Sequence, residues 1–167
     1  MNLTQVVLGL GSNLGDSRSI VLGAIKALEQ VLAELRRASL YETSPLHVTA
    51  QGRFINTAVM GLYSGMPREL LSCAHEIEAR FGRDRARERR WGERRLDIDI
   101  LLFGDLKVSE PELEIPHPRL CERRFALEPL LELLPHAVEP GTMRSYLSIC
   151  GVLPDQGVKV LPEEVKK

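Results

Sequence analysis

The stretch RRWGERRLDIDILLFGD, residues 89–105, places two aspartates inside a strongly apolar segment. Alternate side chains of a strand share one face, so Asp97 and Asp99 would point the same way, about 6–7 Å apart. The isoleucines that alternate with them would point to the opposite face. Aspartate is a poor strand former, and two of them in one strand indicate a compensating role. The stretch therefore predicts a strand over residues 96–103 with a pair of carboxylates on one face.

Two carboxylates at this separation suit a hard cation. Mg²⁺ commonly binds one or two carboxylates and completes its shell with water and phosphate oxygens. Without a cation the two groups would repel each other, and the pKa of one of them would rise. The alternative interpretation is the polar face of a half-solvated strand.

The segment directly before this strand is rich in arginine. Guanidinium groups bind phosphate oxygens in a bidentate manner, so cations beside metal-binding anions indicate a site for a polyphosphate–metal complex. The alternative is a solvated charged loop that its own acidic residues partly neutralise. Trp91, the only tryptophan, is either a lid or stacking residue for a substrate or a local packing anchor. The arginines of the segment are Arg83, Arg85, Arg87, Arg89, Arg90, Arg94 and Arg95.

The length, composition and net charge of the chain limit the classes of protein to which it can belong. Its 167 residues, 44% hydrophobic and 27% charged, predict a single domain over residues 1–167 and exclude a disordered or membrane-embedded chain. A net charge of −1 provides no overall field that would attract nucleic acid. The scattered cysteines and the absence of a signal-peptide pattern predict a cytoplasmic protein. We expect poor order in the tail, residues 151–167, where proline, glycine and charge accumulate.

Periodicity outside residues 89–105 predicts the remaining elements. Their order is strand, helix, strand, strand, helix, strand, which is typical of ferredoxin-like α+β domains with an antiparallel sheet and two helices on one face. The rest, from Gly104, would be a C-terminal extension with helices near 122–135 and 142–149. The expected core strands span residues 5–10, 38–44, 54–64 and 96–103, and the expected helices run from 17 to about 37 and from 67 to 81.

The common nucleotide-binding motifs are missing. The chain has no G-x-x-x-x-G-K-[ST] loop, and the glycines of GLGSNLG, residues 9–15, do not have the spacing of the dinucleotide fingerprint. That glycine segment alone predicts only a tight connection between a strand and a helix.

Three segments together carry a resemblance to a known family. GLGSNLGD (9–16), RRWGERRLDIDILLFGD (89–105) and IPHPRLCERRFALEPLLEL (115–133) resemble, in order and spacing, the 6-hydroxymethyl-7,8-dihydropterin pyrophosphokinases of folate biosynthesis. The resemblance implies a ferredoxin-like core and transfer of the β,γ-pyrophosphoryl group of the co-substrate ATP to the pterin hydroxymethyl oxygen, which yields AMP. It also implies two Mg²⁺ ions held by Asp97 and Asp99, with Asp97 contacting both ions and accepting the hydroxyl proton.

The same resemblance assigns residues to the nucleotide. Arg83 and Arg94 match catalytic arginines that bind the ATP phosphates. His117 matches a histidine that contacts an ATP phosphate, and Arg123 matches the arginine of the same motif. Glu78 matches a carboxylate near the ribose.

For the pterin, the resemblance implies a flat apolar sandwich with amide-like hydrogen bonds. Phe54 and Phe125 match the two stacking positions, and Asn56 matches the side chain that reads the ring. Thr43 and Leu46 match positions whose backbone reads the ring edge, and Trp91 would close over the substrate.

Two acidic residues depart from the family pattern. Glu112 and Glu114 lie where less acidic residues would help to hold ATP, which bears on nucleotide affinity. Two other classes of protein also use this fold: RNA-binding modules, for which the arginine loop would be the footprint, and metal-binding regulatory domains. The strands lack paired exposed aromatics, so we expect small-molecule substrates, no nucleic acid or membrane partner, and a monomer.

Overall fold

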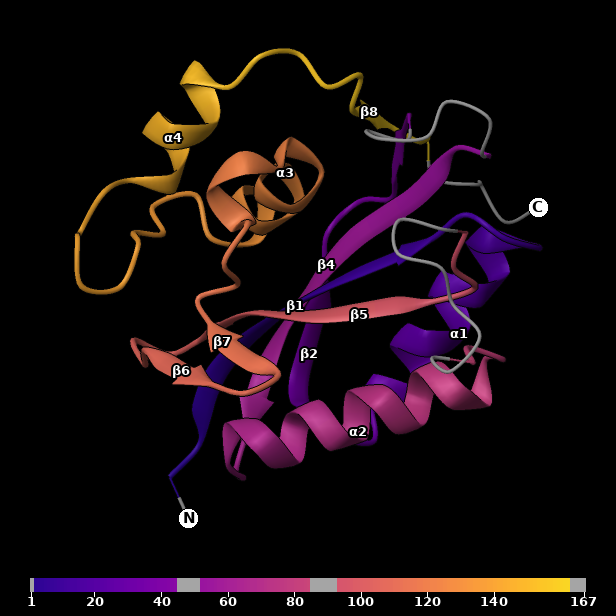
Figure 1. Ribbon diagram of the computed structural model, residues 1–167, viewed down its shortest axis with the longest axis horizontal. Helices are drawn as coiled ribbons and strands as arrows, with labels where there is room; N and C mark the ends of the chain where they lie inside the picture. Colours follow the sequence, from indigo (N-terminus) through magenta and orange to yellow (C-terminus); the bar gives the residue numbers. More distant parts are fainter. Residues whose placement is uncertain (1, 45–51, 85–92, 163–167) are drawn as a thin grey trace.

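A computed structural model of the chain describes residues 2–44, 52–84 and 93–162. Its centre is a six-stranded antiparallel sheet (Figure 1). The strands of this sheet are β1 (Thr4–Ser12), β2 (Ala33–Arg37), β3 (Tyr41–Thr43), β4 (Phe54–Tyr63), β5 (Asp97–Phe103) and β8 (Lys159–Val160). They follow the order β5-β1-β4-β3-β8, and β2 also pairs with β4. The strand of the acidic pair, β5, therefore lies at one edge of the sheet.

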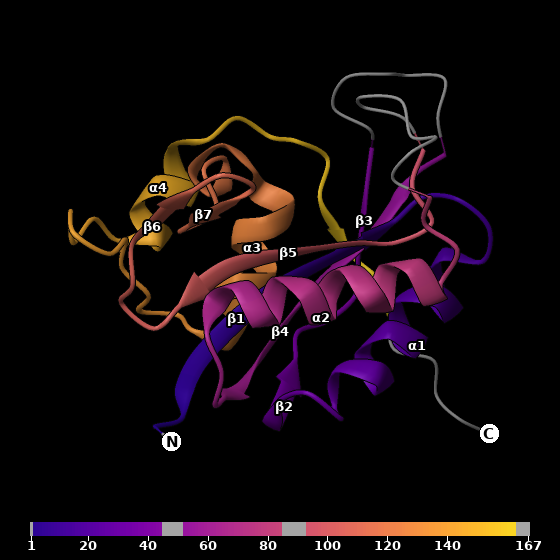
Figure 2. The ribbon, with the colours of Figure 1, turned by 60° about the horizontal axis from the view of Figure 1, so that its bottom comes forward.

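Helices cover the two faces of the sheet (Figure 2). The helices α1 (Ser17–Leu28) and α2 (Pro67–Arg80) pack on one face, and α3 (Arg124–Leu133) and α4 (Tyr146–Val152) lie on the other. Alternation along β1 separates the two cores, because Val6 and Leu8 face α1 and α2 whereas Val7 faces α3. The predicted mixed α/β architecture with an antiparallel sheet is confirmed.

A capping residue and a proline mark the starts of α1 and α2 in the sequence. The Asp16 carboxylate caps α1 and accepts a hydrogen bond from the Ser19 backbone N–H at 3.1 Å. Pro67 occupies the first turn of α2, where its missing N–H costs nothing.

The first helix is shorter than predicted. The expected helix reaches about residue 37, but α1 ends at Leu28, and Ala33–Arg37 forms β2 instead. Glu34 adopts a left-handed φ of 53°, which an α-helix does not allow. The apolar periodicity was misleading because Leu32 and Leu35 pack into the same core as the helix.

The segment after β2 also differs in detail from the prediction. Of the strand expected over 38–44, only Tyr41–Thr43 is regular, although the Ala38 N–H still donates to the Ala58 carbonyl at 2.9 Å. The last helix begins after Ser145, whose side chain caps it, and not at Thr142.

The chain beyond β5 starts with a small hairpin of β6 (Val108–Glu110) and β7 (Leu113–Ile115), followed by the short 3₁₀ helix η1 (Leu120–Glu122). None of the helices in the described part of the chain has the length and apolar character that a membrane span needs.

Candidate active site

The register of the sheet places the acidic pair beside two glycines of β1. Asp97 pairs with Gly11 and Asp99 with Gly9, and Gly11 pairs on its other side with Asn56. Directly paired residues of an antiparallel sheet project to the same face. Gly9 and Gly11, here named the floor, therefore place no β1 side chain between the carboxylates of β5 and the amide of Asn56 on β4. The Leu101 side chain lies next to Gly9, and Gly11 is buried.

Gly11 leaves space for the Asn56 side chain. A Cβ atom at this position would lie 2.7 Å from the Asn56 Oδ1 atom, closer than real contacts allow. The glycine thus lets the Asn56 amide lie over the floor. The Asn56 Nδ2 donates to the Thr43 hydroxyl at 2.8 Å, which holds the amide in place from the neighbouring strand β3.

Asp97 is bound by two arginines. Its Oδ1 accepts from Arg83 Nη1 at 2.6 Å, and its Oδ2 accepts from Arg94 Nη1 at 2.5 Å. Burial alone would raise the pKa of Asp97, but the charges and hydrogen bonds of Arg94 and Arg83 hold that pKa below its usual value. Asp97 is therefore an ionised carboxylate at neutral pH, with two guanidinium groups next to it.

Glu78 supports this cluster from inside the protein. Its carboxylate, 1% exposed, accepts from Arg83 Nη1 at 2.5 Å and from the backbone N–H of Ile98 at 2.8 Å. The resemblance places Glu78 near the ATP ribose. Its burial instead favours a structural role, in which it binds Arg83 and the backbone at the start of β5.

Asn13 anchors the arginine segment to the glycine turn, a role that the sequence interpretation missed. The Asn13 Oδ1 accepts from the Arg94 N–H at 2.7 Å, and the Asn13 N–H donates to the Arg94 carbonyl at 3.0 Å. The only signal in the sequence is the presence of Asn13 in the GLGSNLGD motif.

Asp99 lies in a different environment. His117 Nε2 is 3.7 Å and Arg123 Nη1 is 4.0 Å from its Oδ2, so neither makes a close hydrogen bond. Burial, followed by the charge of Asp97, raises the pKa of Asp99 to about 7. Burial and then the charge of Arg123 lower the pKa of His117 to about 4, so this imidazole is neutral at pH 7.

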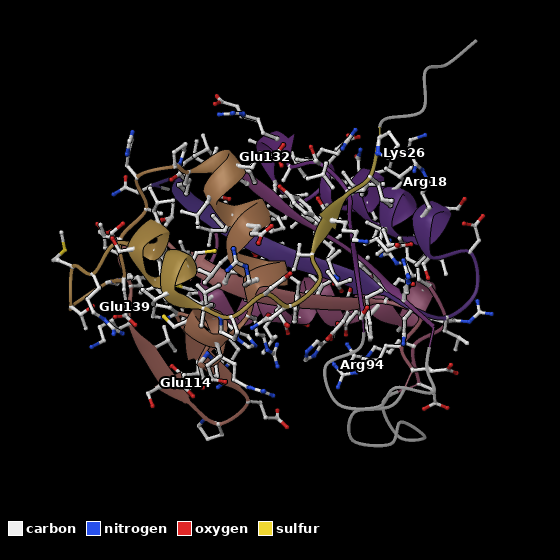
Figure 3. The ribbon with its side chains drawn as sticks, turned by 90° about the horizontal axis from the view of Figure 1, so that it is seen from above. Arg18, Lys26, Arg94, Glu114, Glu132 and Glu139 are labelled. Atoms are coloured by element: carbon white, nitrogen blue, oxygen red, sulfur yellow. The ribbon has the colours of Figure 1, made fainter. Side chains whose placement is uncertain are left out.

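A cavity of about 330 Å³ opens beside Asp99 at the free edge of β5. Glu112 and Glu114 of the β6–β7 hairpin are exposed at its rim. In Figure 3, Arg94 lies near the start of β5 and Glu114 lies on the hairpin. The cavity combines an apolar wall with an acidic rim. Its lining consists of Leu71, His75, Ile98, Asp99, Ile100, Glu110, Glu112, Leu113, Glu114, His117 and Pro118.

The two predicted stacking phenylalanines belong to different elements. Phe54 starts β4, and its Cδ1 lies 4.0 Å from the position that a Cβ on Gly11 would take, so it borders the floor. Phe125 lies in the first turn of α3, with the Arg123 guanidinium 5.6 Å from its ring centre. Leu46, Trp91 and the arginines between 85 and 90 lie outside the described residues.

The carboxylate pair fits a magnesium–phosphate complex better than a metal ion held by protein alone. Within residues 2–44, 52–84 and 93–162, no group of three or more His, Cys, Asp or Glu side chains is arranged to hold a metal ion. Mg²⁺ needs only one or two carboxylates where phosphate and water complete its shell. Asp97 and Asp99 provide that donor set beside arginines that suit phosphate.

Comparisons with known proteins agree with this geometry. The model of the family "7,8-dihydro-6-hydroxymethylpterin-pyrophosphokinase (HPPK)" matches residues 7–135. A mitochondrial folate synthesis bifunctional protein of Arabidopsis thaliana is 42% identical over 146 residues, which are 87% of this chain and 26% of that protein. The chain thus spans about a quarter of the length of this relative.

A relative of similar size is the 2-amino-4-hydroxy-6-hydroxymethyldihydropteridine pyrophosphokinase of Aquifex aeolicus, 40% identical over 83% of this chain and 85% of that one. Among solved structures, a crystal structure of HPPK-DHPS in complex with substrates superposes with a TM-score of 0.77 at 13% identity, covering 96% of this chain and 47% of the other, which shows the shared fold. With its acidic strand, arginine segment and histidine motif all inside or beside the matched region, the chain belongs to the HPPK family.

Proposed function

We propose that the protein transfers the β,γ-pyrophosphoryl group of ATP to the hydroxymethyl oxygen of 6-hydroxymethyl-7,8-dihydropterin, which yields AMP and the pterin diphosphate. Family membership supports this reaction. The observation that carries it is the floor of Gly9 and Gly11, which lies between the Asp97–Asp99 pair and Asn56. A flat acceptor on that floor would have its edge at Asn56 and its reactive end towards the carboxylates.

The acceptor would lie between two aromatic side chains. Phe54 borders the floor from β4, and Phe125 comes from α3 on the same side of the sheet. Asn56, held by Thr43, offers an amide-type group of the kind that a pterin ring can pair with. Leu46 and Trp91 remain predicted substrate contacts on the basis of the resemblance alone.

The nucleotide would bind along the free edge of β5. The cavity beside Ile98 and Ile100 has an apolar wall for a base. Asp99 and His117 lie at its border, and Asp99 is two residues from Asp97, which binds two arginines. Arg83, Arg94, His117 and Arg123 would then contact phosphate oxygens. Neutral His117 can donate a hydrogen bond to a phosphate without adding charge.

Asp97 and Asp99 would hold two Mg²⁺ ions together with the phosphates. Bound Mg²⁺ would neutralise charge on the phosphates and lower the pKa of the attacking hydroxyl. Arg83 and Arg94 neutralise Asp97 when no Mg²⁺ is bound. With Mg²⁺ bound, they would be available to the transferred group. Their contribution would be positioning and stabilisation of developing charge, with no covalent intermediate on the protein.

The protein would act as a single domain, 1–167, with a ferredoxin-like core. Support comes from the order β5-β1-β4-β3 and from the two helices α1 and α2 on one face. We propose a monomer, because the carboxylates, the floor and both phenylalanines come from one chain. We also propose a cytoplasmic enzyme, since Cys73, Cys121 and Cys150 are all free thiols.

The test is product analysis with the purified protein, ATP, Mg²⁺ and the hydroxymethyl pterin. Pterin-dependent formation of AMP, with a diphosphate ester visible by phosphorus NMR, is expected. Formation of ADP would overturn transfer of two phosphates as one unit, and nucleotide release without pterin would indicate a hydrolase. Titration of the protein with Mn²⁺ and a non-hydrolysable ATP analogue, followed by electron paramagnetic resonance, tests the metal site without turnover.

The alternatives of an RNA-binding module and a metal-binding regulatory domain receive no support. The net charge is −1, and membership of the HPPK family accounts for the arginines beside the acidic strand.

A further inference from the structure

The segment from residue 154 to residue 161, here named the C-terminal strap, connects α3 and β3, two elements of the candidate site that are far apart in the sequence. In Figure 3, which is seen from the side of α3 and α4, the strap leaves α4, crosses this side of the molecule and ends beside the sheet. At that end Lys159 and Val160 form β8 and pair with Tyr41 and Glu42 of β3. The Leu161 N–H adds a hydrogen bond of 2.7 Å to the Leu40 carbonyl.

The other end of the strap is attached to the start of α3 through Gln156. Its Oε1 accepts from the backbone N–H of Arg124 at 2.9 Å, and its Nε2 donates to the Glu122 carbonyl at 2.8 Å. Arg124 strengthens the attachment, because its Nη1 donates to the Leu153 carbonyl at 2.8 Å and to the Cys150 carbonyl at 3.2 Å. One glutamine side chain thus satisfies two backbone groups at the point where η1 turns into α3.

These two attachment points adjoin the two walls of the acceptor site. Arg124 precedes Phe125, the aromatic wall from α3. β3 carries Thr43, which holds the Asn56 amide on the floor. α3 and β3 belong to different layers, and Glu132 near the end of α3 already joins them, because it accepts from the Tyr41 hydroxyl at 2.6 Å. The strap adds a second connection, at the start of α3, where Phe125 lies.

We propose that Gln156 is a positioning residue, and that the strap sets the distance between Phe125 and the Thr43–Asn56 pair so that a flat heteroaromatic substrate fits between them. This inference rests on the proposed function. A fixed gap lowers the entropy that substrate binding has to overcome, so the strap acts on affinity for the pterin. The nucleotide cavity lies at the opposite edge of the sheet, along β5, and no residue of the strap lines it. Gln156 also binds the backbone on both sides of Arg123, so we expect an effect on the nucleotide that is smaller than the effect on the pterin.

The experiment compares Gln156→Ala, Gln156→Glu and Lys159→Ala in the full-length protein. Gln156→Ala removes both hydrogen bonds. Gln156→Glu keeps an acceptor for the Arg124 N–H but loses the donor to the Glu122 carbonyl. Lys159→Ala is the matched control, because it changes an exposed side chain of the strap and keeps the backbone pairing of β8.

Isothermal titration measures the dissociation constants of a non-hydrolysable ATP analogue and then of the pterin. Gln156→Ala is expected to weaken pterin binding about tenfold while nucleotide binding stays within about twofold, with Gln156→Glu in between. KM for the pterin should rise in parallel, whereas kcat at saturating pterin should stay close to that of the unaltered protein. Unchanged pterin binding in Gln156→Ala, or equal weakening of both ligands, would overturn the proposal.

Hydrogen–deuterium exchange on the unaltered protein provides a test that does not depend on a stable variant. Pterin added to the nucleotide-bound protein should slow exchange at the Arg124 amide, which binds Gln156, and at the Leu161 amide, which binds Leu40. Exchange at both amides that is indifferent to pterin would contradict the proposal. A complete lack of pterin binding by the unaltered protein would instead overturn the proposed function, and the role of the strap with it.

Discussion

The two faces of the sheet are built differently. Under α1 and α2, the β1 side chains Val6, Leu8 and Leu10 are all buried in one continuous core. On the opposite face, β1 presents Val7 and then Gly9 and Gly11, and Asp97 and Asp99 replace apolar residues on β5. One face of the same two strands is used for stability, while part of the other face is left for a ligand.

The comparison shows where the chain tolerates unfavourable local chemistry. Paired carboxylates, a buried Glu78 and glycines within a strand each lower stability by themselves. They are compatible with folding because the β1 side chains of the opposite face are buried in a continuous core under α1 and α2. Changes on the packed face should therefore reduce stability, whereas changes on the open face should reduce function.

The largest effect is expected for Asp97→Ala. Loss of this carboxylate should lower turnover to AMP by at least about a thousandfold, because the metal–phosphate complex loses its ionised ligand. The fold should persist, since Arg83 keeps its hydrogen bond to Glu78. Rapid-quench product analysis measures turnover, and circular dichroism checks the fold. Glu76→Ala, an exposed carboxylate on α2, is the control; normal turnover in Asp97→Ala would remove the metal role.

The matching change on the packed face is Leu28→Ala. Leu28 is fully buried at the end of α1, and its truncation should cost about 3 kcal/mol of unfolding free energy. KM for both substrates should stay the same in the fraction that remains folded. Denaturant titration provides the measurement, and Leu22→Ala, a half-exposed leucine of the same helix, should cost less than about 1 kcal/mol. A rise in KM that accompanies the loss of stability would argue against the separation of the two faces.

A smaller effect on the open face is expected for Gly11→Ala. The new methyl group would meet the Asn56 Oδ1 at 2.7 Å and displace the amide from the floor. Pterin affinity should fall about tenfold, equivalent to about 1.4 kcal/mol, with nucleotide affinity unchanged. Titration calorimetry distinguishes the two ligands. Gly151→Ala, where a methyl group meets no atom within 4 Å, should leave both affinities unaltered.

The smallest effect concerns pH and Asp99. Its pKa is raised from 3.8 to about 7 in the folded protein, so the folded state retains a proton that the unfolded chain releases. The stability linked to that proton is complete below about pH 4 and is lost as the pH rises through about 7.

Asp99→Asn should therefore stabilise the metal-free protein by about 1 kcal/mol at about pH 8, a value reduced because the carboxylate is 36% exposed, and by almost nothing at about pH 4. Denaturant titration at the two pH values, with a chelator present, tests this. An asparagine variant that is less stable at the higher pH would show that the charge of Asp99 is well compensated without metal.

Much of the architecture could be predicted because it depends on short-range patterns. The alternation of Asp97 and Asp99 with isoleucine placed both carboxylates on one face of β5, and the periodicity of α2 placed it correctly from Pro67. The family resemblance, carried by three motifs, is confirmed by the match over residues 7–135. The division of residues 17–37 into α1 and β2 could not be predicted, because a helix and a strand bury leucines against the same core.

By itself, the sequence determined the alternation of β5, the glycine turn and the composition of the phosphate-binding motifs, since each depends on neighbours within a few residues. Only the tertiary structure decided that Glu78 would support Arg83, that Asn13 would hold Arg94, and that Gln156 would bind the start of α3. The physical reason is that a hydrogen bond between distant segments leaves no periodic trace in the chain. It exists only because the packed layers bring one donor and one acceptor to within about 3 Å of each other.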